Sequence, residues 1–375
     1  MQDIHLQGFR LLAPELVLGT VSLIVLVMDL VWKERGSSRL GWIAIVGLAI
    51  SGILLILAFD GSVGDTAFGI VVVDKFGNFF KLFTCGALMV VIGFVMGDRN
   101  ERKDRIGEYY FLLLGAAMGI FFMVGTNNLL LLILGLELLS LSSYALAGFH
   151  KGEKRSAEAA MKYVVFGGFS TGVMVYGISL LYGLTGTLDL QVMAGTAEGV
   201  GLTRSLADAV TTSPTTVALA MIMILGGFAF KIAVAPFHFW APDVYEGAPT
   251  PVTTFLAVAS KAAGFGALLR FLAVLFMSPD VATAVGAYGL KMATLIAIMA
   301  AVTMTLGNLA ALRQESVKRM LAYSSIAHSG YVLVALVALK GWGLEAAVLA
   351  RVAYDRMNLG ACVVGTPVHW HTGKD

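Results

Sequence analysis

Three ionisable side chains, Glu137, Lys231 and Lys261, lie within long apolar stretches of this 375-residue chain. Counting about 1.5 Å per residue places all three away from the ends of their stretches. Burial disfavours the charged form of each group, whereas proximity of a carboxylate and an ammonium favours both charges. A pair that separates and rejoins therefore releases and rebinds a proton, which is the chemistry of a proton relay. The alternative is a static ion pair that fixes helix contacts.

The stretch after Lys231 interrupts an apolar run more strongly than any other part of the chain. Val217–Phe230 is typical of a membrane helix, and four prolines follow within KIAVAPFHFWAPDVYEGAPTPV. Pro236 cannot donate to the carbonyl of Ile232 and its ring clashes with that turn, so we expect the helix to break just after Lys231. Open backbone at membrane depth needs protein or water around it, which predicts an internal polar cavity. A helix that ends at the membrane surface, with Lys231 snorkelling, is the alternative.

The composition indicates an integral membrane protein. Hydrophobic residues make up 58% of the chain and charged residues 13%, with a mean hydropathy of +0.83. Apolar runs of roughly 20 residues predict an all-α, polytopic transmembrane helix bundle of about ten or eleven spans. Cys85 and Cys362 form no CxxC pattern, and GxGxxG, flavin and metal-ligand motifs are absent from the sequence. We therefore expect no metal and no cofactor on this chain.

The basic residues of the loops alternate in density along the chain. Following the positive-inside rule, the N-terminus is expected outside and the basic loops in the cytoplasm. The loop with Asp243 and Glu246 also falls inside, yet it has no basic residue. We place the spans at Leu11–Val31, Leu40–Phe59, Phe76–Met96, Tyr109–Val124, Leu129–Phe149, Ala159–Leu181, Val217–Phe239, Val252–Phe276, Met292–Leu312, Met320–Leu339 and Leu344–Val364. The basic loops are those with Lys33, Arg35 and Arg39, with Arg99, Arg102, Lys103 and Arg105, with Lys151, Lys154 and Arg155, and with Arg313, Lys318 and Arg319.

The remaining charges within spans lie nearer the predicted ends. Lys162 is about one turn from the inner end, so it is either an anchor or part of a pathway. The last predicted span contains Arg351 and Asp355, and a lipid-facing arginine at the midplane would cost roughly 2.5 to 3.5 kcal/mol. Residues 1–365 are expected to form one membrane domain, followed by a polar tail at 366–375. Snorkelling to the surface is the expected explanation for Glu15, Asp29, Lys81, Arg270 and Lys291.

Further polar side chains are spaced to continue a relay. Ser140 follows Glu137 at i+3, and Ser325 precedes His328 at i−3, so each pair shares a helix face. Such serines either line a water path or are ordinary small residues between membrane helices. His238 lies two turns beyond the lysine that precedes the break. It either titrates near neutrality to transfer protons or is a structural, hydrogen-bonded histidine.

Several longer strings resemble a known family, from the first predicted span to about residue 361. The chain resembles the subunit N family of proton-pumping NADH:quinone oxidoreductase, respiratory complex I, whose members are antiporter-like membrane subunits. The strings that carry the resemblance are GLEL from Gly135, SAEAAMKY from Ser156, KIAVAPFHFWAPDVYEGAPTPV from Lys231, SKAAGF from Ser260, GNLAAL from Gly307 and KRMLAYSSIAH from Lys318.

The resemblance implies a chain that moves protons while quinone is reduced elsewhere in the complex. It implies a bacterial cytoplasmic membrane, other membrane and peripheral subunits as partners, no nucleic acid, and NADH, flavin, iron–sulfur clusters and quinone on partner subunits. It implies that Glu137 and Lys231 form the coupled pair, that Lys261 is the central relay, and that Lys162, His238 and His328 belong to the same polar axis.

The chain departs from the family near its end. Family members have fourteen spans in two inverted five-helix repeats, and the second repeat contains another broken helix with its own lysine. That second broken helix is not found after Ala361, so we expect an incomplete second repeat, from either a truncated or frameshifted product or an incomplete gene model. Two other functions remain open from the residues: an autonomous Na⁺(K⁺)/H⁺ antiporter, and a non-pumping scaffold whose buried charges specify assembly.

Overall fold

Long apolar helices make up most of the protein, as its hydropathy predicts. The computed structural model describes residues 8–32, 37–59, 66–97, 105–197, 199, 203–287, 292–337 and 343–372. Within these ranges, ten helices are long and apolar enough to cross a membrane. The predicted fold class, an all-α polytopic bundle, is confirmed.

In the described part of the chain, the helices follow one another with a single interruption. This is a β-hairpin whose two strands have two residues each. The longer helices are α2 (Ala13–Trp32), α3 (Ser37–Leu57), α4 (Lys75–Gly97), α5 (Ile106–Val124), α6 (Leu129–Ala147), α7 (Lys154–Thr185), α10 (Pro214–Lys231), α13 (Lys261–Phe276), α15 (Met292–Ala311), α16 (Val317–Val337) and α17 (Gly343–Thr372). The short elements are β1 (Thr66–Ala67), β2 (Val71–Val72), α8 (Leu190–Met193), α9 (Leu206–Thr212), α11 (Trp240–Gly247), α12 (Thr250–Phe255), a π-helical turn (Leu256–Ser260) and α14 (Pro279–Ala287). The hairpin pairs Thr66 with Val72 and Ala67 with Val71 in antiparallel register.

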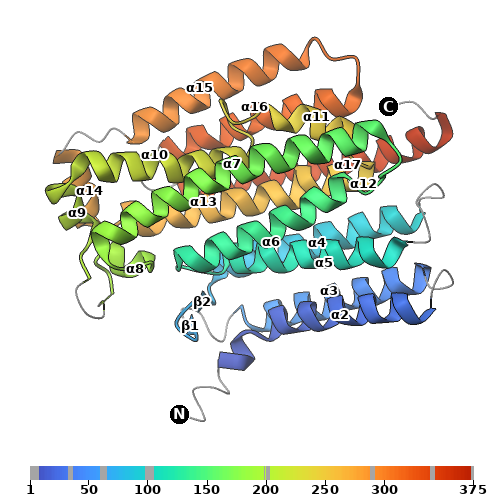
Figure 1. The fold of residues 1–375 in the computed structure, drawn as a ribbon, viewed down its shortest axis with the longest axis horizontal. Helices are drawn as coiled ribbons and strands as arrows, with labels where there is room; N and C mark the ends of the chain where they lie inside the picture. Colours follow the sequence, from blue (N-terminus) through green and yellow to red (C-terminus); the bar gives the residue numbers. More distant parts are fainter. Residues whose placement is uncertain are drawn as a thin grey trace.

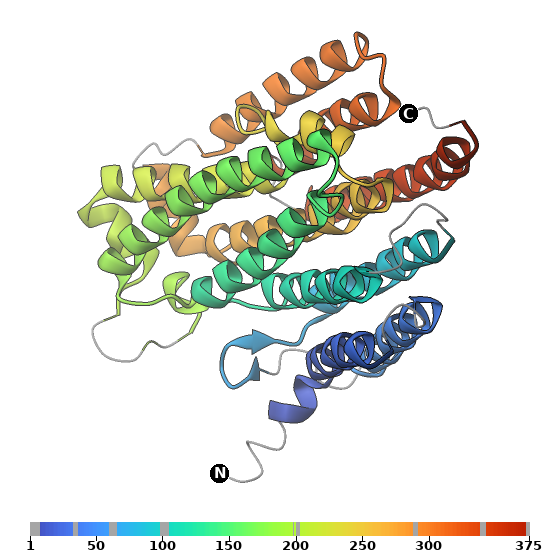
Figure 2. The same cartoon turned by 45° about the vertical axis from the view of Figure 1, so that its right-hand side comes forward.

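Helices that are consecutive in the sequence pack next to each other in space. α2 and α3 lie side by side at one edge of the bundle, and α15 lies at the opposite edge against α16 (Figures 1 and 2). α7 and α10 are neighbours, and α11 lies between α7 and α16. α13 lies inside this arrangement, and α17 packs against α16 and extends to the edge of the bundle (Figures 1 and 2). The first part of the broken segment between α10 and α11, Ile232 to Ala235, is buried, whereas Pro236 and Phe239 are exposed.

Specific residues set the ends of the helices near this region. The side chain of Asn128 accepts hydrogen bonds from the amides of Leu130 and Leu131 and so begins α6. Gly186 adopts a left-handed conformation, with φ of 71°, at the end of α7. Pro214 begins α10 at a position where its missing N–H has no helical partner to lose.

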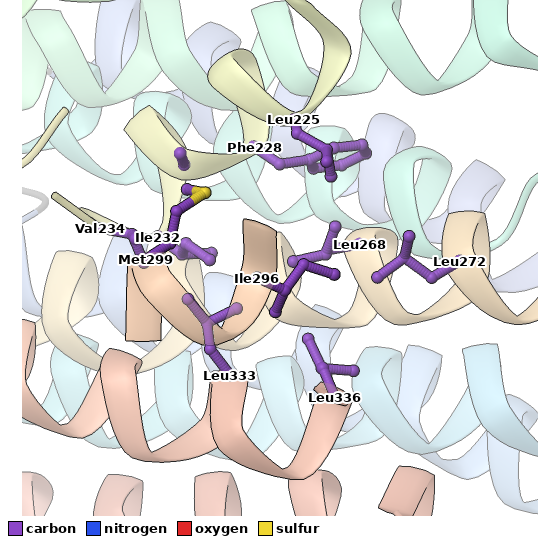
Figure 3. Close-up of a pocket in the computed structure, with 11 residues that line it drawn as sticks. Leu225, Phe228, Ile232, Val234, Leu268, Leu272, Ile296, Met299, Leu333 and Leu336 are labelled. Atoms are coloured by element: carbon purple, nitrogen blue, oxygen red, sulfur yellow. The ribbon is translucent and has the colours of Figure 1, made fainter. Parts of the chain in front are cut away.

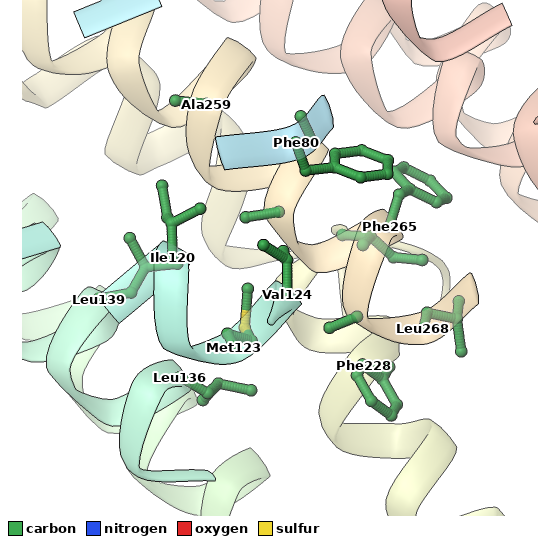
Figure 4. Packing of buried hydrophobic residues seen from close by; sticks show 14 of the residues in the cluster. Phe80, Ile120, Met123, Val124, Leu136, Leu139, Phe228, Ala259, Phe265 and Leu268 are labelled. Carbon is green, nitrogen blue, oxygen red and sulfur yellow. The ribbon is translucent and has the colours of Figure 1, made fainter. Parts of the chain in front are cut away.

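The apolar core joins α4, α5, α6, α10 and α13. Figure 4 shows Phe80, Ile120, Met123, Leu136, Phe228 and Phe265 converging from these helices. α5 and α6 are in close backbone contact at Gly119 and Gly135, where an added Cβ at Gly119 would lie 2.5 Å from the amide nitrogen of Leu139. Small residues permit such close contact between membrane helices. These glycines fix the position of α6, which carries Glu137.

The snorkelling expected for three of the charged residues is wrong. Glu15 and Lys81 are buried and form an ion pair of 2.6 Å between α2 and α4. Arg270 is also buried, and its guanidinium makes two hydrogen bonds of 2.7 Å to the carboxylate of Asp74. Each of these charged side chains has an oppositely charged partner within the bundle. The partner compensates for burial, so the side chain does not extend to the membrane surface.

The last predicted span, Leu344–Val364, lies within α17, but α17 is not among the ten apolar helices in the described ranges. Arg351 and Asp355 lower its hydropathy, and both side chains are buried against neighbouring helices. The polar tail predicted at 366–375 continues α17 as far as Thr372. Residues 33–36, 98–104 and 373–375, together with Lys291 and Lys340, lie outside the described residues.

Candidate functional site

The predicted helix break after Lys231 is confirmed. α10 ends at Lys231, and a non-helical segment leads to α11, which begins at Trp240. Ala233 has a positive φ of 55°, a backbone conformation that no α-helix contains, and the Ala235–Pro236 peptide is cis. The side chain of Lys231 is buried, with 1% of the residue exposed. The alternative, a helix that ends at the membrane surface with Lys231 snorkelling, is therefore excluded.

Neighbouring helices satisfy the backbone groups that the break leaves open. Such compensation is what permits non-helical backbone at membrane depth. The groups are bound from three sides, by α11, α15 and α16. The indole nitrogen of Trp240 donates to the carbonyl of Phe230 at 3.1 Å, the hydroxyl of Ser329 donates to the carbonyl of Ile232 at 2.8 Å, and the amide of Ala235 donates to the hydroxyl of Thr303 at 3.1 Å.

The ammonium of Lys231 lies against α6, where a serine accepts its hydrogen bond. Its Nζ donates to the Oγ of Ser140 at 3.2 Å. Glu137 is one turn earlier on the same helix, and no ion pair joins it to Lys231 among the described residues. The Oε1 atom of Glu137 is buried and accepts no hydrogen bond from the part of the chain that the structure describes. The carboxylate of Glu137 and the ammonium of Lys231 therefore form no direct ion pair in the part of the chain that the structure describes.

Lys261 occupies a second interruption of helical geometry. It directly follows the π turn Leu256–Ser260, and 1% of the residue is exposed. Its Nζ donates to the Oγ of Ser325 on α16 at 2.5 Å. The same ammonium lies 5.6 Å from the centre of the Tyr245 ring, a distance typical of a cation–π contact. Like Lys231, Lys261 is a buried ammonium held by a serine of a neighbouring helix.

The two lysine-bearing helices touch at a glycine. Gly264 lies one turn after Lys261 on α13, and a Cβ at this position would lie 3.1 Å from Cγ of Lys231 and 2.9 Å from Cγ2 of Ile232. Only a residue without a side chain leaves room for the stem of Lys231 here. The glycine thus brings the two lysines to adjacent turns of neighbouring helices.

The structure places the two predicted histidines in different surroundings. His328 on α16 stacks on the ring of Tyr354 from α17, with the ring centres 3.8 Å apart. His238 lies in the segment between α10 and α11, and its Nδ1 atom is buried without a hydrogen-bond partner among the described residues. His238 also lines a cavity of about 370 Å³, whereas the partly exposed His328 is not among the residues that line it.

A charged cavity joins α7, α11 and α16. The carboxylate of Asp243 binds the ammonium of Lys162 at 2.6 Å through one oxygen and the guanidinium of Arg319 at 2.7 Å through the other. Arg319 also contacts Glu246 at 2.9 Å, and Lys162 contacts Glu158 at 2.7 Å. These side chains line a cavity of about 180 Å³. Lys162, left open as anchor or pathway residue, is therefore part of an ionic network at a cavity.

A second cavity of about 370 Å³ shares Lys162, Asp243 and Arg319 with the first. His238 and Pro242 also line it. Both volumes are many times larger than a water molecule requires. The first cavity has mainly polar walls and the second has charged side chains beside apolar ones, so water can occupy both. Together the cavities extend from the ionic network to the broken segment.

The opposite side of the break is apolar. A small cavity of about 20 Å³ is enclosed by α10, α13, α15 and α16, and its wall consists of aliphatic and aromatic side chains and Met299 (Figure 3). Ile232 and Val234 of the broken segment face it (Figure 3). A cavity of this size and lining offers water no hydrogen-bond partner. The break thus separates a polar side from a dry side.

The ionic network affects the titration of Asp243, which lies in α11, outside the ten apolar helices. Burial raises the pKa of this carboxyl, but the hydrogen bonds and charges of Lys162 and Arg319 lower it further, and the net pKa lies below the ordinary value. Asp243 is therefore ionised at neutral pH.

The sequence did not predict the ionic network or the buried pair on α17. Asp243 and Glu246 stood out as acidic residues in an inner loop without basic ones, and their cations come from α7 and α16. Arg351 and Asp355 form an ion pair within α17, and both are buried. Their i, i+4 spacing was the available signal.

The described part of the chain is an antiporter-like bundle of membrane helices, with buried lysines at two interrupted helices. Residues 126–369 match the family described as NADH:quinone oxidoreductase/Mrp antiporter, TM. The chain belongs to this family, and the predicted resemblance is confirmed.

The similar proteins are longer than this chain, which matches about 70% of their length. NADH-quinone oxidoreductase subunit N 2 of Chloroherpeton thalassium is 38% identical over 371 residues, which are 98% of this chain and 70% of the relative. NADH-quinone oxidoreductase subunit N of Bacillus anthracis is 41% identical over 365 residues, with coverage of 95% and 69%.

Solved structures agree with this assignment. A chain of respiratory complex I from Thermus thermophilus, solved with bound aureothin, has a TM-score of 0.73 and 34% identity, covering 94% of this chain and 70% of that one. A chain of the Mrp complex from Dietzia sp. DQ12-45-1b has a TM-score of 0.74 at 19% identity, covering 99% and 65%, and shows the shared fold alone.

Proposed function

We propose that this chain is a proton-translocating membrane subunit of an NADH:quinone oxidoreductase, and that NADH, quinone, flavin and iron–sulfur clusters are bound by its partner subunits. The observation that carries the proposal is the pair of buried lysines, Lys231 and Lys261, each at an interruption of a helix and each held by a serine. A buried ammonium with one neutral partner is easily deprotonated, since burial disfavours its charge. Such a group can pass a proton on, whereas a fully paired one cannot.

The route begins at the charged cavity. Lys162 and Asp243 form an ion pair in its lining, and His238, in the broken segment, also lines it. From there protons reach Lys231, whose charge is favoured when Glu137 approaches and disfavoured when Glu137 withdraws. Lys261 then receives the proton, because Gly264 places its helix against the stem of Lys231. His328 and Tyr354 continue the axis beyond Lys261.

The residues around the cavity support the predicted orientation in the membrane. Arg155 and Arg319 belong to two of the predicted cytoplasmic loops, and both line the same cavity. We therefore place the cavity at the cytoplasmic side of a bacterial inner membrane and the N-terminus outside. The apolar cavity beside Ile232 is the barrier that keeps protons from crossing past the break.

The test is the Lys231→Ala variant in the assembled complex, reconstituted in liposomes. Proton translocation is expected to fall at least about tenfold, because a positioned proton-transfer group typically contributes that much or more. Lys154→Ala, an exposed lysine at the start of α7, is the matched control and should pump normally. Unaltered pumping by Lys231→Ala contradicts the proposal.

Two other outcomes separate the alternative functions. An autonomous antiporter, which the Mrp-like fold permits, would exchange Na⁺ or K⁺ for protons when the purified chain alone is placed in liposomes. A scaffold would show less assembled complex in Lys231→Ala, with unchanged turnover for each complex that remains.

A further inference from the structure

One buried charge pair has no part in the proposed relay. Arg351 and Asp355 lie one turn apart on α17 and form an ion pair, with 1% and 0% of each residue exposed. Removing two charges from water costs several kcal/mol for each ion unless the surroundings compensate. The pair therefore has a specific set of contacts, and these lead to Lys261.

The guanidinium of Arg351 binds the backbone of the π turn. Its Nη2 donates to the carbonyl of Ala257 at 2.7 Å and lies 3.5 Å from the carbonyl of Val258. A π turn inserts one extra residue into a helix, which leaves backbone groups without their ordinary i+4 partners. A buried carbonyl in this position needs an outside donor. Arg351 supplies that donor from a different helix.

Aromatic rings hold the guanidinium in place. Its Cζ lies 5.6 Å from the ring centres of both Phe265 on α13 and Tyr354 on α17. Tyr354 in turn stacks on His328. Arg351 is thus fixed between the helix that carries Lys261 and the helix that carries its serine partner.

We propose that Arg351, neutralised by Asp355, is a positioning residue that holds the π turn Leu256–Ser260 and thereby directs the ammonium of Lys261 to Ser325. Lys261 is the residue directly after the π turn, so an ordinary α-helical turn there would rotate its side chain by about 100°. That rotation would remove the ammonium from Ser325. The inference rests on the proposed function only for the role of Lys261 as a proton carrier.

The test uses the assembled complex with three variants of the pair and one control. Arg351→Lys keeps a charged donor of similar reach, and Arg351→Met removes it but leaves Asp355 buried and unpaired. The double variant Arg351→Met/Asp355→Leu removes both charges, so it can fold without a buried unpaired carboxylate. Arg356→Met changes an exposed arginine on the same helix and is the matched control.

Two quantities are measured in each variant: amide hydrogen exchange in peptides that contain the π turn, and the pH profile of proton translocation. In the double variant we expect exchange at the π turn to rise at least about tenfold, which corresponds to the loss of one hydrogen bond to a charged group. We also expect its pH profile to move, because the ammonium of Lys261 has lost its fixed position beside Ser325. Arg351→Lys should retain most of the protection, and Arg356→Met all of it.

Unchanged exchange at the π turn in the double variant would overturn the proposal. A second result would also overturn it: less assembled complex, with amide exchange and pH profile the same as in the unaltered protein. That result is expected of an ion pair that only supports the structure. The exchange measurement does not depend on proton transfer. If Lys261→Met pumped normally, the proposed function would fail, while the exchange data would still decide whether Arg351 holds the π turn.

Discussion

Lys231 on α10 donates to the hydroxyl of Ser140 on α6 at 3.2 Å, one helical turn from Glu137. The serine therefore holds the ammonium in the arrangement in which Glu137 is not its partner. A hydrogen bond to a charged group contributes about 1.5 to 3 kcal/mol. Loss of this bond should shift the ammonium of Lys231 from Ser140 toward Glu137.

Ser140→Ala is expected to lower proton translocation by roughly tenfold, the factor that corresponds to about 1.4 kcal/mol. Ser140→Thr retains the hydroxyl and should restore most of the activity. Ser179→Ala, whose hydroxyl bonds only within α7 and is exposed, is the control. Pumping rates in reconstituted complexes give the comparison, and equal rates for Ser140→Ala and Ser179→Ala would show that the serine has no such role.

Asp243→Asn removes the carboxylate that bridges Lys162 and Arg319. The two ion pairs are partly exposed, so we expect the free energy of unfolding at neutral pH to fall by about 1 kcal/mol. The pKa of Asp243 lies below its ordinary value in the folded protein, so its stabilising effect is present above about pH 4 and is lost as the pH falls through the folded value.

Thermal unfolding of the detergent-purified protein at a series of pH values measures this effect. The difference in unfolding midpoint between the unaltered protein and Asp243→Asn should be constant from neutral pH down to about pH 5. Below about pH 4 it should shrink. A difference that grows on acidification would contradict the assigned ion pairs.

Lys81→Met tests the buried pair with Glu15. The single variant leaves an uncompensated buried carboxylate and should lower the free energy of unfolding by about 3 to 5 kcal/mol. The double variant Glu15→Leu/Lys81→Met removes both charges and should recover most of that loss. Unfolding midpoints of the two variants, measured side by side, provide the test. If the double variant is no more stable than the single one, the pair is not the reason for the burial of these side chains.

The sequence predicted the broken helix and the two buried lysines because both signals are local. Pro236 fixes where the helix opens, and the apolar residues around Lys231 and Lys261 fix their depth. It did not predict which residue of α6 meets Lys231. Glu137 and Ser140 differ by one helical turn, so both lie on the facing surface, and side-chain rotamers decide between them.

Other features depend on contacts between distant segments. Glu15 and Lys81 are 66 residues apart, and neither position indicates the other. The π turn before Lys261 contains no proline or glycine that would predict it, and its donor, Arg351, is on another helix. A charged residue near a predicted helix end can either snorkel to the surface or pair with a buried residue of another helix. The sequence is compatible with both, and the packing of the helices decides between them.

The central claim is that Lys261 carries protons, and the most direct measurement is the ratio of protons translocated to electrons transferred by the complex with Lys261→Met. Lys75→Met, an exposed lysine at the start of α4, serves as the control. The account predicts a ratio reduced by at least about one half in Lys261→Met, because Met cannot carry a proton. A ratio equal to that of the unaltered complex and of Lys75→Met, with the same amount of assembled complex, would contradict it.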